Sequence, residues 1–99
     1  MNNKYDQELV KLLSEIANHD TMSAILSNLL TPQERDDLGL RVQIFKGLIA
    51  GESQRSLSKR LNVSLATISR GSRELKYGNE GMTKALKYDW PEFFKGKAS

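Results

Sequence analysis

The chain has 99 residues, of which 38% are hydrophobic and 27% charged, and it contains no cysteine. This length and composition predict one small soluble domain, residues 1–99, and the lack of cysteine excludes disulfides and thiolate metal sites. With no apolar run of about 20 residues and no basic-then-apolar N-terminus, we expect a cytoplasmic protein that does not span a membrane.

The net charge of +3 is unevenly distributed along the chain. Residues 41–77 carry eight basic and two acidic side chains, whereas residues 1–40 carry three basic and seven acidic ones. A basic segment of this kind favours contact with nucleic-acid phosphates. A solvated helix surface would give the same charge count, so charge alone leaves both interpretations open.

Helical periodicity begins near the N-terminus. Apolar side chains recur every three or four residues over about residues 4–18, at Tyr5, Leu9, Leu12, Leu13 and Ile16. A second, short helix is predicted from a cap at Asp20 to Leu30, with Met22, Ile25, Leu26 and Leu29 inward. Both helices leave apolar faces that one chain of this size does not easily cover, which predicts a homodimer.

The third predicted helix has the clearest start and stop signals. Thr31 can cap it, Pro32 suits its first position and Glu34 completes a capping box, while Gly51 ends it. Gly39 and Gly47 lie inside, at a cost of about 1 kcal/mol each relative to alanine. Each glycine therefore indicates either that another segment packs closely against the helix there or that the loss of helix stability is simply tolerated.

A pair of helices joined by a tight turn is predicted over about residues 53–77. Asn62 can adopt the left-handed backbone that such a turn needs, and Ser64 can cap the helix that follows. The buried positions expected for this arrangement are Leu57, Leu61, Val63, Ile68 and Leu75, and Ser58 is small where the two helices cross. The pattern is that of a helix-turn-helix, and its alternative is a helical hairpin with no role on DNA.

The second helix of this unit would enter the major groove by its N-terminal part. Base contacts are therefore expected from Leu65, Ala66, Thr67, Ser69 and Arg70, and phosphate contacts from Gln54, Arg55 and Lys76. Four further basic side chains are expected either to contact phosphates or to be plain solvated charges: Lys59, Arg60, Arg73 and Lys76.

Little else in the chain indicates a site. One more short helix is expected around Met82, Ala85 and Leu86, residues 96–99 should be frayed, and Trp90, Phe93 and Phe94 form an aromatic patch expected to be buried. His19 stands alone as a histidine, so no metal is expected. With no nucleophile–base pair and no phosphate-binding glycine loop, an enzyme is not expected.

Four stretches of the chain resemble the tryptophan repressor family: residues 30–35, 38–42, 51–55 and 66–72, the last reading Ala-Thr-Ile-Ser-Arg-Gly-Ser. The similarity covers roughly Ile25 to Lys76. Its most specific part is Arg70-Gly71-Ser72, which a general helix-turn-helix does not require. The segment Lys76 to Gly81 instead resembles a sister group of tryptophan-repressor-like proteins.

The resemblance implies an all-α fold of five to six short helices, an intertwined homodimer, and L-tryptophan as corepressor. Thr31 and Arg70 would hold the ligand carboxylate, Arg41 and Arg70 would sandwich the indole, and Gly71 would leave room for the ring. The backbone carbonyls of Asn28 and Leu30 would accept from the ammonium. The alternatives are a surface arginine for Arg41 and a helix–helix contact for Gly71.

The chain departs from the family pattern at three places. Glu74 stands where the family has a small hydroxyl residue near the ligand ammonium; a carboxylate there would pair with the ammonium or crowd the pocket. Ser58 replaces a lysine that touches the DNA backbone, and one residue is missing between Glu52 and Ser53.

Three functions follow as hypotheses. The first is a sequence-specific repressor of double-stranded operator DNA that L-tryptophan activates. The second is a DNA-binding regulator of the same fold that needs no ligand or takes another one. The third is a protein–protein module, against which the basic segment argues.

Overall fold

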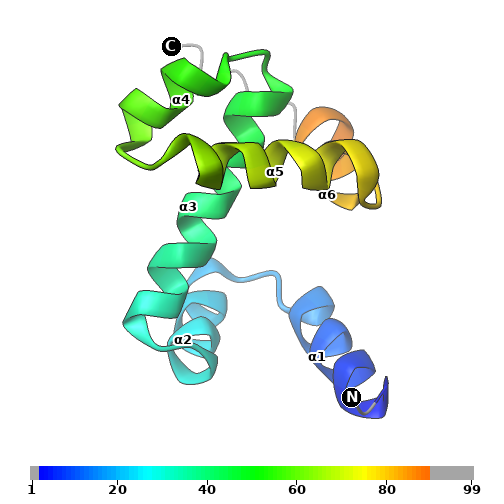
Figure 1. The fold of residues 1–99 in the computed structure, drawn as a ribbon. Coiled ribbons are helices and arrows are strands. Elements are labelled where there is room, and N and C mark those ends of the chain that lie inside the picture. Colours follow the sequence, from blue (N-terminus) through cyan, green and yellow to red (C-terminus); the bar gives the residue numbers. More distant parts are fainter. Residues whose placement is uncertain (1–2, 90–99) are drawn as a thin grey trace. The chain divides into compact units, whose positions relative to one another are not determined.

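A computed structural model describes residues 3–89, and all regular structure in this range is helical (Figure 1). The elements are α1 (Asn3–Glu15), α2 (His19–Leu29), α3 (Pro32–Ile49), α4 (Gln54–Leu61), α5 (Leu65–Tyr77) and α6 (Gly81–Lys84), followed by a π-helical turn, Ala85–Asp89. This confirms the predicted all-α class with its five to six helices. The expectations for residues 96–99 and for the aromatic patch lie outside the described residues.

The chain divides into two compact units, Met1–Asp36 and Asp37–Ser99, and α3 runs across the boundary. The predicted single-domain organisation stays a prediction.

In the first unit, the junction of α1 and α2 differs from the sequence expectation. The cap of α2 is Asn18, whose side chain accepts from the backbone N–H of Thr21 at 2.9 Å, and not Asp20, which lies in the first turn. Asn18 has the extended backbone that a capping residue needs. Because Asn18 must be extended, α1 cannot continue to residue 18, and it ends at Glu15.

The apolar faces of this unit stay open. Neither α1 nor α2 has a buried residue, and Tyr5 and Val10 are 72% and 56% exposed. Arg35, in the first turns of α3, binds α2: it donates to the Ser23 carbonyl and hydroxyl and to the Ser27 hydroxyl, at 2.8–3.1 Å.

The start of α3 forms the predicted capping box. The backbone N–H of Thr31 donates to the Glu34 carboxylate at 2.9 Å, and the Glu34 N–H donates back to the Thr31 hydroxyl at 3.1 Å. At the other end α3 stops at Ile49, and Gly51 takes a left-handed backbone with φ 92°. Both local signals in the sequence are therefore confirmed.

The core of the second unit holds α4 and α5 against the C-terminal half of α3. Ile44, Leu57 and Ile68, one from each helix, are at most 3% exposed, and partly buried apolar residues surround them: Leu40, Leu48, Leu61 and Val63. Figure 1 shows α5 crossing this part of α3. Gly47 allows the close approach, because a Cβ there would lie 2.5 Å from a Leu57 methyl. Core packing thus fixes the helix pair on α3.

Candidate functional site

The turn between α4 and α5 has the predicted helix-turn-helix geometry. Asn62 adopts the left-handed conformation, with φ 56° and ψ 49°. Ser58 closes the turn by donating its hydroxyl to the Val63 carbonyl at 2.5 Å, and the Val63 N–H donates to the Ser58 carbonyl at 3.1 Å. Ser64 then caps α5. Ser58, where the family pattern has lysine, is therefore part of the turn.

The residues expected to contact DNA differ in their exposure. Five are exposed: Arg55, Leu65, Ala66, Arg70 and Lys76. The other three, Gln54, Thr67 and Ser69, are half-buried and already bonded within the protein. The Ser69 hydroxyl donates to the Gln54 amide oxygen at 2.8 Å, and the Thr67 and Ser64 hydroxyls lie 2.9 Å apart.

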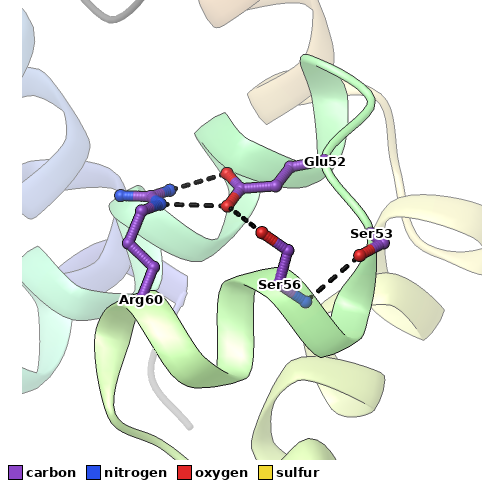
Figure 2. A network of polar contacts seen from close by, with 4 residues as sticks. All are labelled: Glu52, Ser53, Ser56 and Arg60. Atoms are coloured by element: carbon purple, nitrogen blue, oxygen red, sulfur yellow. Dashed lines mark hydrogen bonds and ion pairs between the residues drawn. The ribbon is translucent and has the colours of Figure 1, made fainter.

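Arg60 belongs to a network that joins the loop before α4 to its last turn (Figure 2). Its guanidinium donates twice to the Glu52 carboxylate, at 2.8 and 3.0 Å, and the Ser56 hydroxyl donates to the same carboxylate at 3.0 Å. The hydrogen bond to Glu52 raises the pKa of Arg60 above its ordinary value. The Glu52 carboxylate thus balances the charge of Arg60, which favours a structural role over a phosphate contact.

A cavity of about 400 Å³ lies between α3 and α5 in the second unit. It is lined by Arg41, Ile44 and Phe45 from α3 and by Thr67, Arg70, Gly71 and Glu74 from α5. The lining includes two arginines and one glutamate together with apolar side chains. Such a surface suits a small molecule with a negative group and an apolar body.

Gly71 brings α5 close to α3 beside this cavity. A Cβ at Gly71 would lie 2.8 Å from a methyl group of Ile44, too close without a shift of the neighbour. The helix–helix contact considered from the sequence is therefore present, and Gly71 lines the cavity as well.

The structure brings together four of the seven predicted ligand residues: Arg41, Arg70, Gly71 and Glu74. Asn28, Leu30 and Thr31 belong to the first unit and are not among the residues that line the cavity. The hydroxyl of Thr31 serves as the cap of α3.

Comparison with known proteins decides the family. The family model described as Trp repressor protein matches residues 4–89. Curated relatives called Trp operon repressor homolog, from Vibrio parahaemolyticus and Vibrio atlanticus, are 42% identical over 82 residues and 44% identical over 75 residues. The alignments cover 82% and 75% of this chain and 80% and 76% of the relatives. No solved structure matches the chain.

The chain belongs to the Trp repressor family. The resemblance noted from four short stretches is confirmed, and the match extends over α1 and α2 as well. Trp repressor proteins are transcriptional regulators with a helix-turn-helix, and the family is not one of enzymes.

For this Trp repressor family member, sequence reasoning missed part of the cavity lining. Neither Ile44 nor Phe45 was expected at a site, and Thr67 was expected to contact DNA alone. The signal was nevertheless present: Arg41, Ile44 and Phe45 share one face of α3, three and four residues apart. Thr67, Arg70, Gly71 and Glu74 share one face of α5 in the same way.

Residues 3–89 contain neither a membrane-spanning helix nor a candidate metal centre. No helix in this range is long and apolar enough to cross a membrane. No group of three or more metal-binding side chains occurs in the same range, and His19 is exposed at the start of α2.

Proposed function

We propose that this protein is a sequence-specific repressor of double-stranded operator DNA that works as a homodimer and takes L-tryptophan as its corepressor. The DNA-reading part is α5, entered from the tight turn at Asn62, with α4 beside it. The exposed side chains Arg55, Arg70 and Lys76 supply positive charge along this unit.

One observation carries the ligand proposal: the cavity is built on the helix that would read DNA. Thr67, Arg70 and Gly71 line the cavity and belong to α5. A ligand held there would contact α5 and could therefore favour one position of that helix over another, which is the requirement for linkage between ligand and DNA.

The chemistry of the lining suits L-tryptophan. A guanidinium can hold the carboxylate of an amino acid in a paired hydrogen bond, and the flat faces of Arg41 and Arg70 can stack on an indole. We also propose that Thr31 holds the ligand carboxylate and that the backbone carbonyls of Asn28 and Leu30 accept from its ammonium. These roles rest on the family resemblance alone.

The dimer proposal rests on the first unit. Tyr5, Leu9, Val10 and Leu12 all lie on α1 and are more than 40% exposed. Apolar side chains gathered on one short helix are the kind of surface that a second copy covers.

Calorimetric titration of L-tryptophan tests the ligand site. We expect Arg70→Ala to bind at least about tenfold more weakly than the wild type, because it removes the carboxylate contact. Arg73→Ala is the matched control, since Arg73 is exposed on the same helix and does not line the cavity. An unchanged affinity of Arg70→Ala would refute the assigned site.

A second candidate is a DNA-binding regulator of the same fold that needs no tryptophan. This candidate applies if Glu74, which lines the cavity where the family pattern has a small hydroxyl residue, crowds out the ligand. Selection of bound sequences from random DNA, with and without L-tryptophan, separates the two. Equal enrichment in both conditions would support the second candidate. The name of the curated relatives makes a tryptophan-operon operator the first defined DNA to try.

A further inference from the structure

A hydrogen bond between side chains joins the two helices of the helix-turn-helix. The Ser69 hydroxyl, in the second turn of α5, donates to the amide oxygen of Gln54, the first residue of α4, at 2.8 Å. Both residues are half-buried. The hydroxyl proton of Ser69 is therefore already in use inside the protein.

In this structure the bond holds the Gln54 amide with its oxygen toward Ser69. An amide carries its acceptor oxygen and its NH₂ group on opposite branches of one plane. Once Oε1 accepts from Ser69, Nε2 must point away from Ser69 with both of its donors. Without the Ser69 hydroxyl the Gln54 side chain would lose this anchor and could take other positions.

We propose that Ser69 is a positioning residue, which orients the Gln54 amide so that Nε2 donates to the DNA backbone, and that Ser69 itself reads no base. The inference rests on the proposed DNA-binding function, in which Gln54 contacts phosphate. It changes the expected role of Ser69 from base contact to support of a backbone contact.

The bond is not needed to hold the helices together. Leu57 on α4 and Ile68 on α5 are both 0% exposed and belong to one core cluster, so apolar packing already fixes the crossing. Loss of the hydroxyl leaves the half-buried Gln54 oxygen able to reach water. The Ser69→Ala variant should therefore fold normally, and the substitution should change the affinity for DNA.

The two roles of Ser69 predict different results. A base reader, when lost, lowers affinity for the preferred sequence and spares other DNA. A residue that orients a phosphate contact lowers affinity for all sequences alike. Because glutamine is neutral, losing its phosphate contact should leave the slope of affinity against salt unchanged. If the substitution instead displaced α5 on the DNA, charged contacts would be lost and the slope would become flatter.

The test compares Ser69→Ala, Gln54→Ala, the double variant and Ser69→Thr in the full chain. Affinity is measured on the duplex that the wild type selects from random DNA and on a scrambled duplex, over a range of salt. Ser72→Ala is the matched control, because Ser72 is also half-buried on α5 and is not the residue that bonds Gln54.

We expect each single alanine variant to bind both duplexes about three- to tenfold more weakly, with an unchanged salt slope. The double variant should be no weaker than the singles, and Ser69→Thr, which keeps the hydroxyl, should match the wild type. Thermal unfolding of Ser69→Ala should stay close to that of Ser72→Ala.

Weaker binding by Ser69→Ala on the selected duplex alone would overturn the inference, as would losses that add in the double variant. Wild-type protein that binds neither duplex would overturn the proposed function together with the inference. Wild-type binding with additive losses would overturn the inference only.

Discussion

Glu74 is the acidic residue of a cavity whose basic residues are Arg41 and Arg70, and its carboxylate lies beside Gly78. A free amino acid carries both charges, so this lining offers a partner to each end of such a ligand. Where the family pattern has a hydroxyl, this chain can attract an ammonium by charge. Ligand selection in this protein should therefore depend on the amino group of the ligand.

We expect Glu74→Gln to bind L-tryptophan about five- to tenfold more weakly, because the attraction to the ammonium is lost while the side-chain shape is kept. The affinity for indole-3-propionate, which keeps the ring and carboxylate but lacks the ammonium, should stay unchanged. Calorimetry with both ligands checks this. Tighter tryptophan binding by Glu74→Gln would mean that Glu74 crowds the site, and would favour the second candidate function.

At the scale of elements, α3 contains two glycines in different surroundings. A Cβ at Gly47 would lie 2.5 Å from a Leu57 methyl, and Leu57 is fully buried and cannot give way. A Cβ at Gly39 would meet nothing within 4 Å. The sequence suggested close packing or a tolerated cost for both, and the structure assigns close packing to Gly47.

The two alanine variants should change the free energy of unfolding in opposite directions. Gly47→Ala should lower it by about 1–3 kcal/mol through overpacking. Gly39→Ala should raise it by up to about 1 kcal/mol through helix propensity and a less flexible unfolded chain. Urea unfolding measures both. A loss of stability in Gly39→Ala would show that a second chain lies against that position.

The Glu52–Arg60 pair belongs to the same scale, because it joins the loop before α4 to the end of that helix. The Arg60 side chain is 35% exposed, so solvent weakens the pair. We expect Glu52→Gln to lower the free energy of unfolding by about 0.5–1 kcal/mol, with a smaller difference from the wild type at high salt. Arg60→Gln should lose a similar amount, and the double variant little more. Additive losses would contradict a direct pair.

The sequence predicts a feature of the helices and turns when the residues that determine it are neighbours in the chain. The capping box at Thr31, the left-handed turn at Asn62 and the cap at Ser64 involve neighbours in the chain, and all three were predictable. The cap of α2 was not, because Asn18 and Asp20 are both good capping residues and only the chain path decides between them. The cavity required knowledge of which face of α3 meets α5, and periodicity does not give that pairing.

The whole molecule is proposed to be a dimer, since α1 has no buried residue and exposes several apolar side chains. We expect sedimentation at micromolar concentration to give the mass of two chains. Leu12→Glu, a charge on this apolar face, should weaken association, whereas Lys11→Glu beside it should not. A stable, folded wild-type monomer at that concentration would contradict the dimer.

Regulation is also a property of the whole molecule, because ligand and DNA would both contact α5. The most direct measurement is the affinity for the selected duplex, at fixed salt, with and without saturating L-tryptophan. We expect at least about tenfold tighter binding with the ligand, a coupling of about 1.4 kcal/mol or more, and no such gain in Arg70→Ala. Equal affinity in the two conditions would contradict control of α5 by tryptophan.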